Sequence, residues 1–342
     1  MLPRILIIYT GGTFGMSLTR SGKGDRLSVP RLSPAVLRKN FLTRAPELQE
    51  IARCDVDVLM NRDSAHIGPE EWCRIADHIR AKWGKYDGVV VLHGTDTLAY
   101  TASALSFLLS SCPCPVILTG AQRPLAALRS DARRNLVTAV EIASTGPRPL
   151  VNQVSVFFDD RLFQGNRVHK RSATDYHAFD SPYVPPIATA GTEILYRSER
   201  EKKRAHRSRA TNLKPHFSTR VALLHATPGF PSAVIAEHLL PQLDGIVLNV
   251  FASGTAPTHD AESIEMLRKA KHADIPVIIV SEGGSGADPS TYEAGQKLLE
   301  EGCLWAAGMT TESCYVKAAL LLGQPGRGNF AHAWKRQIAD ES

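Results

Sequence analysis

Two short segments of the chain combine threonine hydroxyls with glycines, each directly after an apolar run. Thr10-Gly11-Gly12-Thr13 follows the run from Ile5 to Tyr9, and His93-Gly94-Thr95-Asp96-Thr97 follows the run from Gly88 to Leu92. Glycines let a backbone turn tightly beside a ligand, and backbone N–H groups in such turns can stabilise an oxyanion. A threonine hydroxyl acts as a nucleophile when a neighbouring base removes its proton. The two turns therefore indicate nucleophilic chemistry, with Thr13 as a candidate nucleophile.

Other interpretations of the two turns stay open at this point. A phosphate-binding loop is one of them, but neither the dinucleotide glycine pattern nor the P-loop lysine follows Gly12. A purely structural turn is another, since Thr95 or Asp96 would suit the start of a helix. Two such turns after strands of one sheet favour a shared site over two separate caps.

Three further residues are candidates for roles in the same chemistry. Lys170 can serve as a general base if its surroundings disfavour its charge, although an isolated lysine is ordinarily a surface residue. Ser64 follows the run from Val56 to Met60, where it can bind a carboxylate or begin a helix. His93 suggests a triad with Thr95, but its place at the end of a buried strand favours a structural hydrogen bond. No cluster has metal-ligand spacing, so we predict neither a catalytic metal nor a cofactor.

These segments depend on a sheet whose strands end at the same edge. The first half of the chain alternates short β-branched runs with helical patterns, which predicts an α/β fold with a mostly parallel, doubly wound sheet. The predicted strands are Ile5–Tyr9, Val56–Met60, Gly88–Leu92, Val116–Thr119 and Val154–Phe158, and the predicted helices lie after Pro69, at Leu98–Leu109 and at Ala132–Ala143. Ligands of such sheets bind beyond the carboxyl ends of the strands, where the threonine turns fall.

The alternation breaks and then resumes, which predicts two domains in the 342 residues. We expect a larger catalytic α/β domain at 1–190, a basic linker at 191–219 and a smaller C-terminal α/β domain at 220–342. The second alternation comprises strands at Val221–His225, Gly245–Val250 and Val277–Val280, with helices near Ser232–Leu240, Asp260–Lys271 and Glu312–Leu322.

Composition excludes several classes of protein. Apolar residues make up 43% and charged residues 22%, as in soluble globular proteins, and no apolar stretch is long enough for a membrane span or a signal peptide. The net charge of +6 includes a basic stretch from Arg197 to Arg209, which lacks interleaved aromatics and is better explained as a solvated linker than as a nucleic-acid site. The six cysteines have no zinc spacing, which favours free thiols in the cytoplasm.

The two turns, in this order and at this spacing, resemble the signature motifs of the bacterial-type L-asparaginases. The similarity continues through the first domain, in the segments Thr119-Gly120-Ala121-Gln122-Arg123-Pro124-Leu125, Leu128-Arg129-Ser130-Asp131, Gly165-Asn166-Arg167, Lys170 and Ser181-Pro182. Gly-Ala-Gln-Arg-Pro-Leu and Arg-Ser-Asp resemble the cytoplasmic type I branch. The resemblance implies hydrolysis of the side-chain amide of L-asparagine to L-aspartate and ammonia through an acyl-threonine, without a cofactor.

Residue roles follow from the resemblance alone. Thr13 matches the nucleophilic threonine, and Thr95 the second threonine, with Lys170 as its base. Asp96 matches the acidic partner of that lysine and the carboxylate that holds the substrate's α-amino group. Ser64 matches the serine that binds the α-carboxylate. The other positions expected to contact substrate are Gly12, Gly94 and Ala121. The resemblance also implies a homodimer or homotetramer in which a partner's second domain completes each site. Composition, as given above, predicts no membrane partner and disfavours a nucleic-acid partner.

Two departures from the family pattern bear on activity. The loop from Ser17 to Val29, which we expect to be a mobile lid, lacks the tyrosine that assists the first threonine in the family. Thr255 stands where the family carries an asparagine near the site. The alternatives left open are an amidohydrolase acting on L-glutamine, D-asparagine or asparaginyl peptides, an ammonia-supplying subunit of a tRNA-dependent amidotransferase, and a non-catalytic amino-acid sensor.

Overall fold

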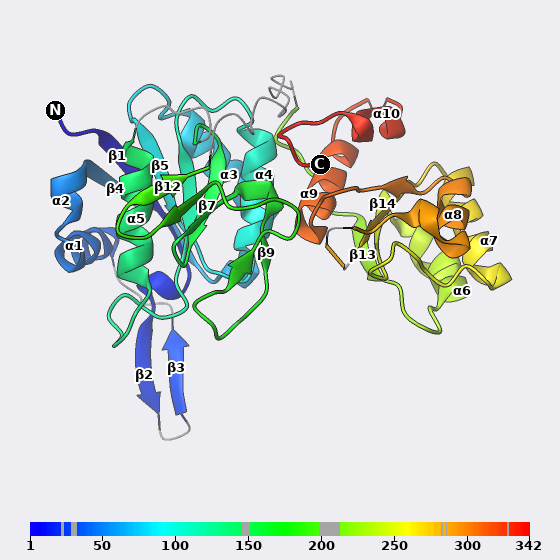
Figure 1. The fold of residues 1–342 in the computed structure, drawn as a ribbon, viewed down its shortest axis with the longest axis horizontal. Coiled ribbons are helices and arrows are strands. Elements are labelled where there is room, and N and C mark those ends of the chain that lie inside the picture. Colours follow the sequence, from blue (N-terminus) through cyan, green and yellow to red (C-terminus); the bar gives the residue numbers. More distant parts are fainter. Residues whose placement is uncertain are drawn as a thin grey trace. The chain divides into compact units, whose positions relative to one another are not determined.

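The chain forms two compact units, Met1–Ala210 and Thr211–Ser342, which are described separately here (Figure 1). A computed structural model describes residues 1–21, 24–28, 33–145, 151–197, 213–281, 283–284, 286–326 and 328–342. Most of the basic stretch predicted to be a linker, including Arg200 to Arg209, lies outside these residues.

The first unit is built on an eight-stranded sheet with the order β12-β11-β8-β7-β6-β5-β1-β4. Its pairings are parallel from β4 through β7, and antiparallel from β7 to β12. The strands are β1 (Arg4–Gly11), β4 (Arg53–Arg62), β5 (Gly88–Leu92), β6 (Val116–Thr119), β7 (Val154–Phe158), β8 (Arg161–Gln164), β11 (Ala188–Ala190) and β12 (Ile194–Tyr196). The predicted fold class, with a mostly parallel sheet in the larger unit, is confirmed.

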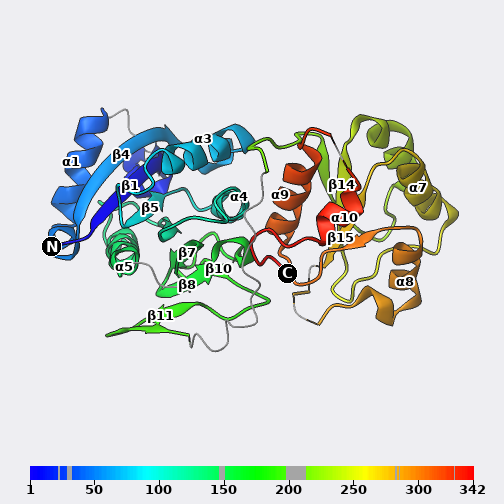
Figure 2. The same ribbon diagram turned by 90° about the horizontal axis from the view of Figure 1, so that it is seen from above.

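Helices cover both faces of this sheet, as continuous apolar strands require. Ile5, Ile7 and Tyr9 of β1 face one cluster of buried side chains, which includes Leu37 and Leu136, while the intervening residues of β1 are fully buried toward the other face. Figure 2 shows the sheet between its helices. The helices are α1 (Pro34–Arg44), α2 (Leu48–Ile51), α3 (Pro69–Arg80), α4 (Leu98–Leu108) and α5 (Ala132–Ser144).

The predicted strands differ in how well they match the strands of the structure. Gly88–Leu92, Val116–Thr119 and Val154–Phe158 have the predicted bounds and are buried throughout. The prediction that Val56–Met60 is a fully buried strand is wrong, because β4 is the edge strand of the sheet and only Val56 and Met60 of the segment are buried.

The sheet continues past β7 in a way that the sequence pattern did not predict. β7 turns directly into antiparallel β8 through Asp159 and Asp160, whose φ angles of 45° and 61° bring the chain around. β11 and β12 then extend the same sheet, and β12 falls inside the segment 191–219 predicted to be a linker. The beginning of that segment is therefore part of the first unit's sheet.

The predicted lid is a β-hairpin instead of an irregular loop. β2 (Ser17–Ser21) pairs antiparallel with β3 (Gly24–Ser28), and the hairpin projects from the first unit (Figure 1). Val29 and the side chains of the hairpin lie outside the described residues, so its predicted mobility stays a prediction.

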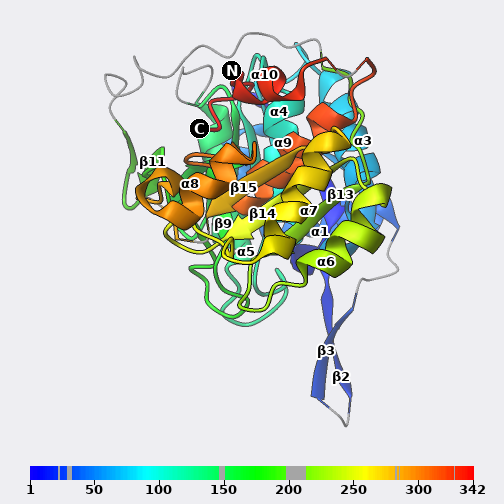
Figure 3. The ribbon, with the colours of Figure 1, turned by 90° about the vertical axis from the view of Figure 1, so that its right-hand side faces the viewer.

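The second unit is a smaller α/β domain on a four-stranded sheet, β13-β14-β15-β16, in which all pairings are parallel. Figure 3 shows α6, α7 and α8 on one side of this sheet, with α9 behind it. The elements are β13 (Val221–His225), α6 (Ser232–Val234), β14 (Gly245–Val250), α7 (Ala261–His272), β15 (Val277–Ser281), α8 (Glu293–Glu300), β16 (Leu304–Trp305), α9 (Thr311–Leu322) and α10 (Phe330–Lys335).

The helix predicted near Ser232–Leu240 is irregular. After α6 the chain forms a π-helical segment at Ile235–Leu239 and a 3₁₀ turn at Leu240–Gln242. Pro241 has no N–H to donate and its ring would clash with an α-helical carbonyl, which accounts for the end of the regular helix.

A buried ion pair holds the end of the chain against α9. Lys317 Nζ lies 2.5 Å from Glu341 Oε1 and donates to the carbonyl oxygens of Trp334 at 2.8 Å and Arg336 at 3.0 Å. The Glu341 carboxylate also accepts from the N–H of Ile338. Both charged side chains are at most 3% exposed, so each depends on the other for the stability of its charge.

His93 has a structural role in the core of the first unit. It is fully buried, with Nδ1 2.7 Å from Gly94 O and Nε2 3.0 Å from Thr101 Oγ1. A carbonyl only accepts, so Nδ1 carries the proton and Nε2 accepts from Thr101, whose oxygen accepts from Trp72 Nε1 at 3.1 Å. Burial lowers the pKa of His93 to about 4, which leaves it neutral at physiological pH.

None of the described helices combines the length and the apolar character that a bilayer crossing requires. All six cysteines are free thiols, as predicted, and burial raises the pKa of Cys112, Cys114 and Cys303.

We expect the imidazole of His93 to remain neutral, with its proton on Nδ1, down to about pH 5. Its folded-state pKa lies below the unfolded value of about 6.5, so its contribution to stability, roughly 3 kcal/mol, is lost as the pH falls from about 6.5 toward 4. Nitrogen-15 NMR of the imidazole measures both properties, and titration of His93 near pH 6.5 in the folded protein would contradict this assignment.

Lys317→Met should lower the free energy of unfolding by about 3–5 kcal/mol, because it leaves the Glu341 carboxylate buried without a counter-charge. Urea unfolding of the full chain measures the change. Lys269→Met, at an exposed position on α7, is the matched control and should change stability by less than about 0.5 kcal/mol. Equal effects of the two substitutions would show that the ion pair is not required.

Candidate active site

The two threonine turns lie on adjacent strands, β1 and β5, at the carboxyl edge of the first unit's sheet. Two further turns flank them, after β4 and after β6, which are the outer neighbours of these strands. Together they bring Thr13, Ser64, Thr95 and Ala121 to one edge, as the parallel topology requires.

The turns after β1 and β5 contact each other through glycine. A Cβ atom on Gly12 would lie 2.3 Å from Gly94 Cα, and one on Gly94 would lie 2.7 Å from the side chain of Ser64. Gly12 also has a φ angle of 78°, which disfavours any side chain. The glycines of both motifs are therefore needed so that three of the turns can pack together.

Other threonines of the same segments brace the strand ends. Thr10 Oγ1 donates to Leu92 O at 2.8 Å, joining the ends of β1 and β5. Thr97 Oγ1 donates to Ser64 O at 2.7 Å, and Thr119 Oγ1 donates to Phe157 O at 2.8 Å. These contacts assign a structural role to three hydroxyls that were not among the predicted site residues.

Lys170 reaches the turn after β5 from a distant part of the chain. It ends β9 (His169–Lys170), and its Nζ lies 2.8 Å from Thr95 Oγ1 and 2.6 Å from Asp96 Oδ1. Its side chain is only 15% exposed, whereas that of Asp96 is 67% exposed. Lys170 is therefore not a solvated surface lysine, and the exposed Asp96 carboxylate is accessible to a second cation.

Gln122 is the second polar group that contacts the Thr95 hydroxyl. Thr95 Oγ1 donates to Gln122 Oε1 at 3.3 Å, while Gln122 Nε2 donates to Asp175 O at 3.0 Å. The backbone N–H of Gln122 donates to the Asp131 carboxylate at 2.9 Å. Gln122 belongs to the motif after β6, but sequence reasoning had not singled it out as a site residue.

Asp131 and Asn135 hold the turn that carries Ala121 and Gln122. The Asp131 carboxylate accepts from the N–H of Gln122 and from Arg123 N at 3.0 Å, and Asn135 Nδ2 donates to Gly120 O at 3.0 Å. Burial raises the pKa of Asp131, while the two backbone N–H groups oppose that shift. These two residues thus act on the site through the backbone.

The prediction that the backbone N–H groups of the first turn point into the site is wrong for Gly12. The N–H of Gly12 had been expected to point into the site as a possible oxyanion donor, but it donates to Arg62 O at 3.0 Å. Thr13 begins the 3₁₀ turn Thr13–Gly15 and is partly buried. Gly12 therefore serves the close packing of the turns, and its N–H already has a backbone acceptor.

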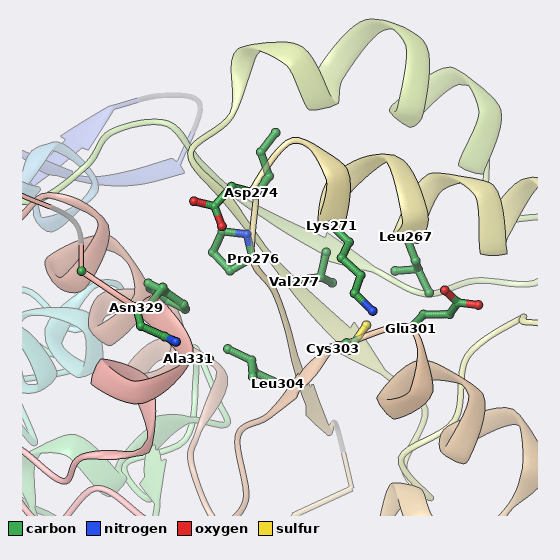
Figure 4. Close-up of a pocket in the computed structure, with 14 residues that line it drawn as sticks. Leu267, Lys271, Asp274, Pro276, Val277, Glu301, Cys303, Leu304, Asn329 and Ala331 are labelled. Atoms are coloured by element: carbon green, nitrogen blue, oxygen red, sulfur yellow. The ribbon is translucent and has the colours of Figure 1, made fainter.

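A separate cavity of about 450 Å³ lies in the second unit, between α7, β16 and α10. Figure 4 shows Lys271, Glu301 and Cys303 among the side chains that line it. None of the residues predicted for the site lines this cavity. Within the described residues, no group of three or more His, Cys, Asp or Glu side chains is arranged to hold a metal ion.

Comparison with known proteins identifies the family of the chain. The chain matches the N-terminal asparaginase domain over residues 4–202 and the glutaminase/asparaginase C-terminal domain over residues 220–331. It is 35% identical to L-asparaginase 1 of Escherichia coli, covering 94% of this chain and 92% of that protein. It is also 34% identical to the 60 kDa lysophospholipase of Mus musculus, covering 94% of this chain but only 59% of that protein.

Solved structures of similar fold belong to the same family. The L-asparaginase of Thermococcus kodakarensis superimposes with a TM-score of 0.83 at 32% identity, covering 99% of this chain and 98% of that one. L-asparaginase I of Vibrio cholerae gives the same TM-score and identity, covering 100% and 99% of the two chains. Family domains over both units, similarity over nearly the whole chain and the shared fold together show that this chain belongs to the asparaginase family.

Proposed function

We propose that this protein hydrolyses the side-chain amide of L-asparagine to L-aspartate and ammonia through a threonine acyl-enzyme. The observation that carries the proposal is the position of Lys170 Nζ, within hydrogen-bond distance of both Thr95 Oγ1 and Asp96 Oδ1. A hydroxyl, a base and a carboxylate partner in this arrangement form a unit for moving a proton. A protein that only binds amino acids has no need of it.

Substrate binding uses the charges that the site exposes. The exposed Asp96 carboxylate holds the α-amino group, and Ser64, beside Gly94, holds the α-carboxylate. Charge-assisted hydrogen bonds of this kind fix the orientation of the substrate. Gly12, Gly94 and Ala121 form the backbone surface beside the amide.

The reaction then proceeds in two halves. The hydroxyl oxygen of Thr13 attacks the amide carbon as its proton passes to the Thr95–Lys170 pair. The pair returns that proton to the amide nitrogen as the C–N bond breaks, and ammonia leaves. Water next attacks the resulting ester, one water proton passes to the Thr13 oxygen as the ester C–O bond breaks, and L-aspartate is released. Backbone N–H groups in the turns stabilise the oxyanion in both halves.

Thr255 motivates a second candidate substrate class. It occupies the position of the family's asparagine, and its hydroxyl lies 3.0 Å from that of Ser253. A shorter, differently bonded side chain there would alter the fit of the substrate, so L-glutamine, D-asparagine or asparaginyl dipeptides are the alternatives. We further propose a cytoplasmic homodimer or homotetramer that requires no cofactor and binds no nucleic acid.

Ammonia release from the four kinds of amide, over a wide range of concentrations, tests the proposed function. We expect the highest kcat/KM for L-asparagine. A higher value for one of the others would shift the assignment to that substrate, and no release from any of them would exclude an amidohydrolase.

Thr13→Ala and Thr95→Val should each nearly abolish hydrolysis without unfolding the protein, because neither change alters the glycine contact that packs the turns. Single-turnover assays and thermal unfolding measure the two properties. If either variant keeps more than about a tenth of the wild-type kcat, a loss of only ~1.4 kcal/mol, its assigned role is wrong.

Lys170→Met should lower kcat at least ~100-fold at saturating substrate, since it removes the amine but keeps the length of the stem. Arg171→Met is the matched control, because that neighbouring cation is exposed and lies 3.9 Å from the Asp180 carboxylate. We expect near-normal turnover of the control. Comparable losses in both variants would indicate an effect of local charge instead of a base.

A further inference from the structure

The loop that follows Lys170 is ordered by its own hydrogen bonds. β9 pairs with β10 (Phe179–Asp180), and Arg171 N donates to Ala178 O at 2.8 Å, which closes the loop at its base. At its tip, Ser172 Oγ accepts from Asp175 N at 2.9 Å. We call residues 171–178 the lysine loop.

His177 joins the lysine loop to the sheet. Its Nδ1 lies 2.9 Å from Asp159 Oδ2, and its Nε2 lies 2.9 Å from Arg161 Nη1. A guanidinium only donates, so Nε2 must accept and Nδ1 must carry the proton that is donated to Asp159. The two partners belong to the tight turn after β7 and to β8, which fixes the imidazole in one tautomer and one orientation.

The lysine loop in turn holds Gln122. Its carbonyl oxygens at Ser172 and Asp175 accept from Gln122 Nε2 at 3.4 and 3.0 Å. This fixes the orientation of the Gln122 amide and presents Oε1 to the hydroxyl of Thr95, 3.3 Å away. A second tie, from the hydroxyl of Tyr176 to Arg129 O, joins the lysine loop to the same turn after β6.

Thr95 therefore lies between two groups that depend on one loop. Lys170, at the base of the lysine loop, donates to Thr95 Oγ1, and Gln122, held by the tip, accepts the proton of Thr95. Any displacement of the lysine loop changes which partner the Thr95 proton faces.

We propose that His177 is a positioning residue for Thr95: through Asp159 and Arg161 it fixes the lysine loop, whose carbonyls set Gln122 on the Thr95 hydroxyl. The inference rests on the proposed function, because the hydroxyl that it orients is the one assigned to proton transfer there.

A double-mutant cycle in the full chain tests the proposal. We expect His177→Leu and Gln122→Met each to lower kcat about tenfold with little change in KM, and the double variant to be no slower than Gln122→Met. Non-additivity is expected when two residues act through one path. Independent losses, multiplying to about 100-fold, or a change in KM alone would overturn the proposal.

Two controls separate positioning from a general loss of structure. His177→Gln keeps an acceptor for Arg161 and a donor for Asp159, so it should retain most of the wild-type kcat. His78→Leu removes a comparable histidine–carboxylate pair, with Asp57 at 2.9 Å on the edge strand, and should leave kcat unchanged. Equal losses in His78→Leu, or a loss in His177→Gln as large as that in His177→Leu, would count against positioning.

The positioning role of His177 can also be tested without measuring turnover. In a crystal structure of His177→Leu, Gln122 Nε2 should no longer lie within hydrogen-bond distance of Asp175 O, whereas it should in His78→Leu. An undisturbed Gln122 would refute the positioning role even if the wild-type enzyme releases ammonia normally. A displaced Gln122 in a chain that hydrolyses none of the amides would support the positioning role while the proposed function fails.

Discussion

The contact between Gly12 and Gly94 is the constraint on which the site depends. The backbones of the two threonine turns approach so closely that a single added Cβ atom would overlap the opposite turn. Thr10 and Thr97 then tie these turns to Leu92 and Ser64 through hydrogen bonds to carbonyl oxygens. Because the turns extend adjacent parallel strands, the sheet sets their positions, and the hydroxyls of Thr13 and Thr95 are attached to a rigid core.

The proton-transfer group is assembled across a long separation in the chain. Lys170 and Thr95 are 75 residues apart and meet only because β7, β8 and β9 bring the chain back to the carboxyl edge of the sheet. The tight turn at Asp159 and Asp160 makes that return possible, with two consecutive residues at positive φ. The same turn supplies the carboxylate that holds His177, so one backbone feature serves both the lysine and the loop beside it.

Sequence alone predicted the buried strands well because parallel strands covered on both faces are continuous apolar runs, as in Val90 and its neighbours. It predicted β4 poorly, because an edge strand need not be apolar throughout. α1 was missed, although Leu37 and Phe41 have helical spacing, and Ser33 as N-cap and Pro34 in the first turn were present as signals. The roles of Gln122 and His177 depend on backbone carbonyls and on a turn conformation, and a sequence pattern contains neither.

The Asp96 carboxylate connects the substrate to the base in the proposed function. Lys170 contacts both the Asp96 carboxylate and Thr95, and the proton of Thr95 is directed to Gln122. A substrate α-ammonium group on Asp96 would compete for the charge that stabilises the protonated lysine. The Lys170 amine, no longer held by Asp96, would then be directed at the Thr95 hydroxyl alone. In the proposed function, the carboxylate that binds the substrate thus also positions the base, which ties activation of the hydroxyl to occupancy of the site.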